Sequence, residues 1–231
     1  GLRELYKGFV SMVSHQFRTP LSIIDASAQR IIRRGRQMTE EEIHERAGKI
    51  RAAVLRLTRL VSSTLNAAKM DAGQIDVDIR RCDLAKLIVE ACERQMETSP
   101  NRVFRIELEQ LPAWTCCDPL LIDQVVANLL SNAVKYSSHP YPIDVSAEAD
   151  HRQVRILVSD RGVGIPEEER HKLFERFFRA RTAVGVEGTG IGLHVARTIA
   201  RMHGGDVDAF AREGGGSTFV LTIPREEALA A

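Results

Sequence analysis

Apolar residues return every seven positions through the first part of the chain. This row consists of Val10, Phe17, Ile24 and Ile31, and a period of seven is typical of a helix packed along a seam. The row on the opposite side passes through His15 and holds no large apolar residue; its other members are Gly8, Ser22, Gln29 and Arg36. The pattern predicts a helix over residues 2–34 that holds the imidazole of His15 in solvent, with Thr19 one turn further along nearly the same face.

A second helix is predicted after a turn at Gly35. Thr39 and Glu42 have the spacing of a capping box, which marks a helix start, and apolar residues then recur in steps of four and three as far as Ala68. Two long helices joined by a short turn form an antiparallel hairpin, which cannot cover its own apolar seam. We therefore expect residues 1–70 to be a helical-hairpin dimerisation domain that forms a four-helix bundle with a second copy.

Beyond Asp71 the pattern changes to short strands and shorter helices. Helices are predicted after the capping residue Asp83 and over 119–136, 166–178 and 190–203. Strands are predicted near 75–79, 103–108, 143–149, 154–158, 206–211 and 217–223. Strands and helices mixed without a regular βαβ repeat indicate an α+β sandwich, with helices on one face of a mixed sheet. This second domain is expected to occupy residues 71–231.

The distribution of charge also divides the chain into two modules. Residues 1–70 carry 13 Lys and Arg against 6 Asp and Glu, and the remainder carries 19 against 25. We expect different partners for the two modules. Nucleic acid is not among them, because the basic residues are scattered and aromatic residues make up 5% of the chain.

Neither a membrane segment nor a signal peptide is expected in this chain, because no window approaches 18 consecutive apolar residues. The chain starts at Gly1 inside a helical pattern, so we expect it to be a fragment that follows an upstream sensor module. Its four cysteines form no C-x-x-C pair; they are Cys82, Cys92, Cys116 and Cys117. Thiols without a disulfide framework fit a reducing cytoplasm, so the predicted location is cytoplasmic.

Three segments of the second domain suggest one ligand. On the helix after Asp118, four polar residues share a face that suits a metal-bound polyphosphate; they are Asn128, Asn132, Lys135 and Tyr136. The motif D-R-G-V-G-I at 160–165 follows a strand, and its glycines let the backbone approach a flat ligand. The motif G-T-G-I-G-L at 188–193 opens a helix, where free N–H groups attract phosphate. Each segment alone is weak support, and an ordinary solvated face is the simpler interpretation of the first.

Taken in order, these segments resemble the N, G1, F and G2 boxes of the sensor histidine kinases, with F-x-x-F-F at 174–178 as the F box. The sequence S-H-Q-F-R-T-P-L at 14–21 resembles their H box. The likeness extends from about residue 5 to residue 224. It implies an ATP-binding domain of the histidine kinase, gyrase and MutL type after the helical hairpin.

The resemblance also implies roles for single residues. His15 would take the γ-phosphoryl group of ATP and pass it to an aspartate in the receiver domain of a response regulator. Asn128 and Asn132 would hold Mg²⁺, Lys135 and Tyr136 would contact phosphates, and Asp160 would receive the adenine amino group. Residues 180–189 would form a lid, with Arg179 near its root. The remaining nucleotide contacts are expected from Gly162, Gly164, Ile165, Arg179, Gly188, Thr189, Gly190, Gly192 and Leu193. Thr19 matches the position that orients water in kinases that also dephosphorylate their regulator.

The residue after the phosphoacceptor departs from the family pattern, in which it is commonly acidic. Gln16 can orient the ring of His15 but cannot act as a base, which puts the rate of autophosphorylation in question. One alternative is therefore a nucleotide-binding dimeric scaffold that acts mainly as a phosphatase. An ATP hydrolase of the gyrase, MutL and chaperone group is a poorer alternative, because such proteins typically carry a glutamate where this chain has Asn128 and they lack an H box.

Overall fold

The computed structural model describes the backbone of residues 2–71, 75–137, 140–183, 186 and 188–225, and the side chains of these residues except 2–16, 59–60 and 62–71. The chain divides into two compact units, Gly1–Ala68 and Lys69–Ala231, which are described separately. The domain boundary predicted from the sequence lies two residues beyond this division.

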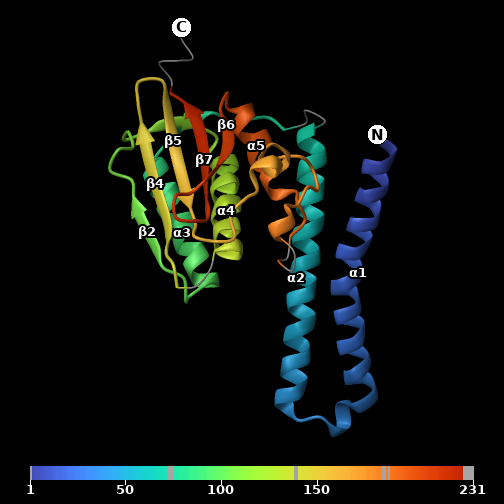
Figure 1. Cartoon of the computed structure of the whole chain (residues 1–231). Helices are drawn as coiled ribbons and strands as arrows, with labels where there is room; N and C mark the ends of the chain where they lie inside the picture. Colours follow the sequence, from blue (N-terminus) through green and yellow to red (C-terminus); the bar gives the residue numbers. More distant parts are fainter. Residues whose placement is uncertain (1, 72–74, 138–139, 184–185, 187, 226–231) are drawn as a thin grey trace. The chain divides into compact units, whose positions relative to one another are not determined.

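The first unit is a hairpin of two long helices. Helix α1 (Leu2–Arg34) is followed by a 3₁₀ turn, η1 (Gly35–Gln37), and by α2 (Glu40–Asp71), which runs back antiparallel to α1 (Figure 1). The capping box at the start of α2 is present: the Thr39 N–H donates to Glu42 Oε2 at 3.0 Å, and the Glu42 N–H donates to Thr39 Oγ1 at 3.2 Å. The two predicted helices and their turn are thereby confirmed.

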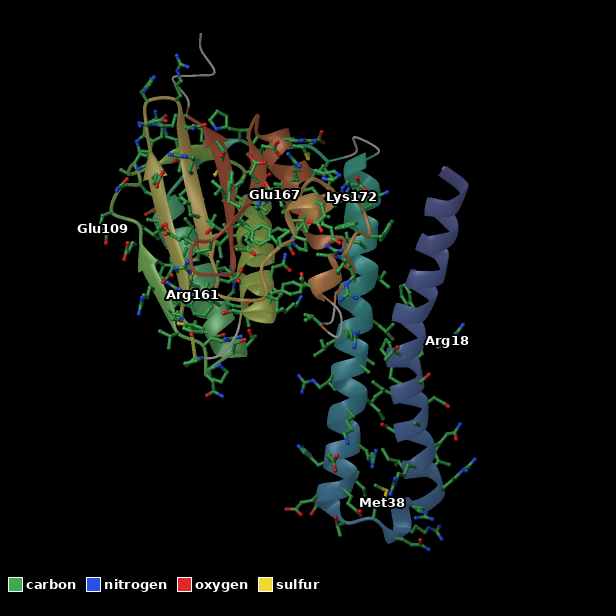
Figure 2. All side chains as sticks on the ribbon, in the orientation of Figure 1. Arg18, Met38, Glu109, Arg161, Glu167 and Lys172 are labelled. Carbon is green, nitrogen blue, oxygen red and sulfur yellow. The ribbon has the colours of Figure 1, made fainter. Side chains whose placement is uncertain are left out.

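The hairpin leaves many apolar side chains exposed within a single protomer. The predicted seam residues Phe17, Ile24 and Ile31 are half-buried, whereas Ser22, Gln29 and Arg36 of the opposite row are exposed. Arg18 is exposed as well and points away from α2 (Figure 2). Large exposed apolar residues on the hairpin are Leu21, Ile23, Ile32, Ile43, Val54, Leu55 and Val61. Despite this surface, no helix in the described ranges is long and apolar enough to cross a membrane.

The second unit is a two-layer α+β sandwich, as predicted. Its five-stranded mixed sheet has the order β2-β4-β5-β7-β6, in which only the β2–β4 pair is parallel. The strands are β2 (Phe104–Glu107), β4 (Ile143–Ala149), β5 (Gln153–Ser159), β6 (Asp206–Ala211) and β7 (Ser217–Pro224). Three helices cover one face of the sheet (Figure 1); they are α3 (Leu84–Thr98), α4 (Pro119–Tyr136) and α5 (Gly192–Met202).

Two aspartates start the helices that the sequence assigned to them. The Asp83 carboxylate accepts from the Lys86 N–H at 2.9 Å and caps α3. Asp118 Oδ1 accepts from the N–H groups of Leu120 and Leu121 at the start of α4, while its Oδ2 accepts from the Asp78 N–H at 3.0 Å. Asp118 therefore joins the segment around Asp78 to the helix that carries the predicted nucleotide residues.

The strand predicted over 75–79 is wrong. Residues 75–79 have no regular structure, and strand β1 (Arg80–Cys82) begins after them, where it pairs antiparallel with β3 (Thr115–Cys117). Ile79 is 48% exposed, so its apolar side chain does not mark a buried strand face. The three-residue β3 was not predicted at all. The four cysteines, three of which lie in this ribbon, are free thiols.

The helix predicted over 166–178 is also wrong. Only the 3₁₀ segment η2 (Glu167–Lys172) forms, and Figure 2 labels both of its ends. Beyond it the chain turns through Phe177, which has a φ of 66°. A positive φ at an aromatic residue is strained and persists only where surrounding contacts impose it. Those contacts belong to the site described next.

Candidate functional site

Helix α4 supplies the platform of the candidate site. One face of α4 is part of the core; its fully buried residues there include Ile122, Val126, Leu129 and Ala133. On another face Asn128, Asn132 and Tyr136 are half-buried and Lys135 is exposed. Packing of the apolar face therefore fixes the helix while the polar row stays accessible to a ligand.

The glycine loop after β5 is joined to the end of α4. A Cβ atom on Gly162 would lie 1.9 Å from the carbonyl oxygen of Tyr136, so only glycine allows the two backbones to come this close. Ser137 and Gly162 also form an antiparallel β-bridge. The loop 160–165 is therefore held against the C-terminal end of α4.

The second glycine segment reaches the same helix. A Cβ on Gly192 would lie 3.4 Å from Asn128 Oδ1, and a Cβ on Gly188 would lie 3.8 Å from the Tyr136 hydroxyl. The Ile191 N–H donates to Thr189 Oγ1 at 3.2 Å, directly before α5 begins. Residues from three segments distant in sequence thus meet on α4. Ile165 and Leu193 are half-buried within the same two glycine segments.

Asp160 is the buried carboxylate of the site, with 2% of its surface exposed. Its Oδ1 accepts from the Gly162 N–H at 2.7 Å. Burial raises the pKa of Asp160 above its ordinary value, against the opposing effect of the Gly162 and Ser217 N–H groups and of Arg212. The carboxyl group is therefore buried and held in a fixed direction, which suits recognition of an amino group.

Arg212 is a site residue that the sequence analysis missed. Its guanidinium pairs with Asp144 and donates to the backbone carbonyl of Asp160 at 3.4 Å. A Cβ on the neighbouring Gly216 would lie 2.8 Å from the Asp160 carbonyl carbon, so the β6–β7 hairpin packs directly on this residue. The glycine run at 214–216 was the available signal.

The two ends of the predicted lid are joined by contacts between Phe177, which precedes it, and Gly190, which follows it. The Phe177 N–H donates to the Gly190 carbonyl at 2.9 Å, and a Cβ on Gly190 would lie 2.6 Å from the Phe177 carbonyl carbon. Near the root of the lid, the Arg179 guanidinium donates to the carbonyls of Ala183, at 2.8 Å, and Val186. Arg179 therefore binds the backbone of the loop itself, and its expected contact with a nucleotide stays a prediction.

The lid is also linked to the first glycine loop, because Thr182 Oγ1 donates to the Gly164 carbonyl at 3.1 Å. Gly164 has a φ of 69°, a conformation that glycine adopts without strain. Residues 184, 185 and 187 of the predicted lid lie outside the described residues.

The polar row of α4 fits a magnesium ion that is shared with a ligand. Mg²⁺ prefers hard oxygen ligands, and the carboxamide oxygens of Asn128 and Asn132 supply two. Among the residues that the structure describes, no group of three or more His, Cys, Asp or Glu could hold a metal unaided. Such a site suits Mg²⁺ that arrives with phosphate oxygens, which is how proteins usually bind this ion.

On the hairpin, the side chain of Thr19 is exposed, one turn beyond the predicted phosphoacceptor. His15 and Gln16 belong to α1, but their side chains lie outside the described residues. The prediction that the imidazole of His15 faces solvent therefore stays a prediction.

Comparison with known proteins matches each of the two units to a protein family. Residues 6–73 match the His Kinase A (phospho-acceptor) domain, and residues 117–227 match the Histidine kinase-, DNA gyrase B-, and HSP90-like ATPase domain. The catalytic domain of histidine kinase ThkA is 31% identical, with a TM-score of 0.56 over 64% of this chain and 96% of that domain. The chain belongs to the sensor histidine kinases. Because a gyrase-type hydrolase has no phosphoacceptor domain, the match at 6–73 favours a kinase core over that alternative.

SrrB and a longer structure of ThkA resemble both units of this histidine kinase core. Sensor protein SrrB of Staphylococcus aureus is 30% identical over 98% of this chain, which spans 39% of the length of that protein. The structure of histidine kinase ThkA in complex with response regulator protein TrrA is 25% identical, with a TM-score of 0.69 over 97% of this chain and 64% of that chain.

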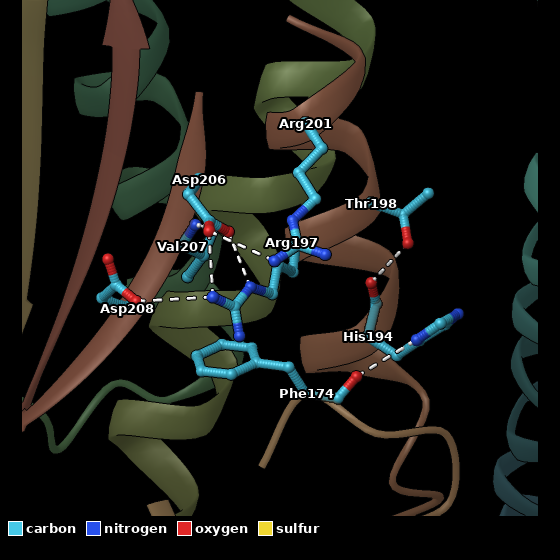
Figure 3. A network of polar contacts seen from close by, with 8 residues as sticks. All are labelled: Phe174, His194, Arg197, Thr198, Arg201, Asp206, Val207 and Asp208. Atoms are coloured by element: carbon cyan, nitrogen blue, oxygen red, sulfur yellow. Dashed lines mark hydrogen bonds and ion pairs between the residues drawn. The ribbon is translucent and has the colours of Figure 1, made fainter. Parts of the chain in front are cut away.

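In the kinase core, an ion-pair network joins α5, which follows the second glycine segment, to the start of β6 (Figure 3). On α5, Arg197 donates from Nε to Asp206 Oδ1 at 2.6 Å and from Nη2 to Asp206 Oδ2 at 2.9 Å. Burial alone would raise the pKa of Asp206, but the hydrogen bonds from Arg197, from the Val207 N–H and from Arg201 lower it to about 2. This carboxylate therefore stabilises the folded unit while it is ionised.

The depressed pKa of Asp206 predicts a stability change in acid. A carboxyl with a lowered folded-state pKa stabilises the protein above its ordinary pKa, and the contribution disappears as pH falls through the folded-state value. For Asp206 this window lies between pH 4 and 2. Because the site is partly accessible, we expect a loss of about 1 kcal/mol there. Urea unfolding at pH 5 and pH 2.5 should show it, and Asp206→Asn should reduce the difference. Equal acid sensitivity in both proteins would contradict the assignment.

Proposed function

We propose that this chain uses MgATP to phosphorylate His15 and then passes the phosphoryl group to an aspartate in the receiver domain of a response regulator. The observation that supports it best is the convergence of both glycine segments on α4, at Asn128 and Tyr136. The matching phosphoacceptor domain adds a histidine with the flanking sequence of an H box. In this proposal residues 1–70 form the phosphoacceptor and dimerisation domain, and residues 71–231 form the catalytic domain.

Each candidate site residue of the catalytic unit has one role in the proposed reaction. Asn128 and Asn132 hold Mg²⁺, which neutralises phosphate charge, and Lys135 and Tyr136 bind phosphate oxygens. The buried Asp160 carboxylate accepts from the adenine amino group. The Nε2 atom of His15 attacks the γ-phosphorus as the bond to ADP breaks, and the Nδ1 proton is released. Phosphoryl transfer depends mainly on positioning and charge stabilisation, which is what these residues supply.

The proposed partner is a response regulator, and the support comes from a relative. ThkA, which shares both units with this chain, has been crystallised in complex with response regulator protein TrrA.

Labelling with ATP that carries radioactive γ-phosphate tests the kinase proposal. We expect label that is stable in base and lost in acid, as is typical of phosphate on a histidine nitrogen. His15→Gln should remove all of the label, and Asp160→Asn should reduce it by weakening ATP binding without unfolding the protein. A parent chain that binds MgATP but takes up no label would contradict autophosphorylation.

A phosphatase activity is the second candidate, because Thr19 is exposed one helical turn from His15. A water held there would face the same bound regulator. We expect Thr19→Ala to slow loss of phosphate from the regulator by about 10²-fold, the lower end of the range for removing a group that assists proton transfer, while His15 is still phosphorylated. Measuring both rates with one regulator preparation checks this. An equal fall in the two rates would mean that Thr19 serves only the helix.

The exposed apolar surface of the hairpin predicts a homodimer. Val54 is 46% exposed and Leu57 half-buried in one protomer, although both belong to the predicted seam. Replacing both by Asp places two charges in the bundle core, so we expect monomers at micromolar concentration. Sedimentation velocity measures this. The matched control is Ala52→Asp, an exposed position on the outer face of α2, which should remain dimeric. A dimer that survives the double substitution would exclude the four-helix bundle.

A further inference from the structure

Arg197 has a second contact, which its pairing with Asp206 does not explain. Its guanidinium lies over the ring of Phe174, 4.5 Å from the ring centroid (Figure 3). Phe174 is buried, and Arg197 is half-buried. Because Asp206 accepts hydrogen bonds from Nε and Nη2 along one edge of the guanidinium, the flat face of the group is presented to the ring in one orientation. Arg197 therefore anchors Phe174 to α5.

A second bond holds Phe174 by its backbone. The Nδ1 atom of His194, one turn earlier on α5, lies 3.1 Å from the Phe174 carbonyl oxygen (Figure 3). The side chain and the carbonyl group of Phe174 are thus both held by residues of α5. Three residues later the chain passes through Phe177 with its φ of 66°. Such a conformation persists when the surrounding structure imposes it, and the anchored Phe174 on one side and Gly190 on the other do so.

We propose that Arg197 is a positioning residue for the lid: through the ring of Phe174 it fixes the turn at Phe177, which precedes Arg179 and the predicted start of the lid at residue 180. Arg179 and Thr182 follow this turn and donate to the carbonyls of Ala183 and Gly164, so a displaced turn would move both donors away from their acceptors. The role of the loop as a cover for the nucleotide rests on the proposed function. The anchoring of Phe174 by Arg197 does not depend on that function.

Limited trypsin digestion tests the anchoring without nucleotide. Arg181 is exposed within the loop, and Arg152 is exposed in the distant β4–β5 turn, so their cleavage rates report local and general opening. In Arg197→Lys, which keeps the charge but loses the flat stack, we expect cleavage after Arg181 to accelerate about tenfold relative to Arg152, the size of a partly buried cation–π contact. The matched control is Arg201→Lys, since Arg201 touches Asp206 at 3.3 Å without stacking on Phe174.

A double-substitution cycle separates positioning from general stabilisation. If Arg197 acts through the ring, Phe174→Leu should accelerate cleavage after Arg181 as much as Arg197→Lys does. The double variant should then be no faster than either single one. Additive effects, or equal acceleration at Arg152 and Arg181, would overturn the proposal.

Titration of the same variants with MgATP tests the nucleotide part. We expect Arg197→Lys to weaken binding about tenfold and Arg201→Lys to bind as the parent does. A parent that binds no MgATP would refute the proposed function and leave the digestion result standing. A parent that binds MgATP no more tightly than Arg197→Lys would overturn the lid role itself.

Discussion

Replacing Gly162 by alanine is expected to remove MgATP binding and to destabilise the catalytic unit. The new Cβ would lie 1.9 Å from the Tyr136 carbonyl oxygen and 2.9 Å from Asp160 Oδ1. The first neighbour is backbone and cannot rotate away, so α4 and the glycine loop would have to separate. Inserting a methyl group into a packed site costs about 1–3 kcal/mol or more. The separation would also break the Gly162 N–H bond that orients Asp160.

Gly205→Ala is the matched control for this prediction. Its Cβ would lie 1.9 Å from the Thr222 carbonyl oxygen, so the steric conflict is the same, but the position belongs to neither glycine segment. Urea unfolding should show similar losses of stability in the two variants. Titration with MgATP at a temperature where both stay folded should show lost affinity only in Gly162→Ala. Parent-like affinity in that variant would mean that the loop does not line the nucleotide site.

Helix starts were predictable because their signals are local. Thr39 with Glu42, Asp83, and Asp118 before Pro119 each bring a capping group within three residues of the N–H groups that need it. Such a bond forms regardless of what the rest of the chain does. The alternation in β4 and β5 was equally informative, since both strands run through the centre of the sheet with one face on the helices.

The ribbon of β1 and β3 could not be predicted, because its register depends on a distant partner. Ile75, Val77 and Ile79 alternate as a strand would, yet pairing begins at Arg80, opposite Cys117. The Asp118 carboxylate binds the Asp78 N–H and fixes where the pairing starts. A three-residue strand also carries too little pattern to be recognised.

The helix predicted over residues 166–178 was wrong because contacts with the rest of the catalytic unit determine the backbone there. Its composition permits a helix, but tertiary contacts hold Phe174 against Arg197 and His194 and force the turn at Phe177. Local preference is overridden where a site needs an unusual backbone. The convergence of Asn128, Tyr136 and the glycines was predictable from motif order, whereas the support of Asp160 by Arg212 needed the β6–β7 hairpin to be placed first.

A large gain in autophosphorylation rate is expected when Gln16 is replaced by glutamate. Near neutral pH an unperturbed imidazole is mostly uncharged, so the nucleophile exists without assistance. As Nε2 of His15 bonds to phosphorus, positive charge develops on the ring and the Nδ1 proton must be accepted. A neighbouring carboxylate stabilises that charge and takes the proton, an effect on the order of 10²- to 10⁴-fold. Gln16 can accept the ring N–H but cannot remove the proton.

The expected result is therefore a rate for Gln16→Glu about 10²-fold above that of the parent at pH 7, the lower end of the range for general-base catalysis. MgATP affinity should not change, because residue 16 belongs to the helical hairpin and the glycine segments belong to the other unit. Two controls complete the experiment: Gln16→Ala should be slower than the parent, and His15→Gln combined with Gln16→Glu should take up no label. If Gln16→Glu is no faster than the parent, proton removal does not limit the reaction, and the approach of the two units to each other becomes the step that the phosphoacceptor sequence has to control.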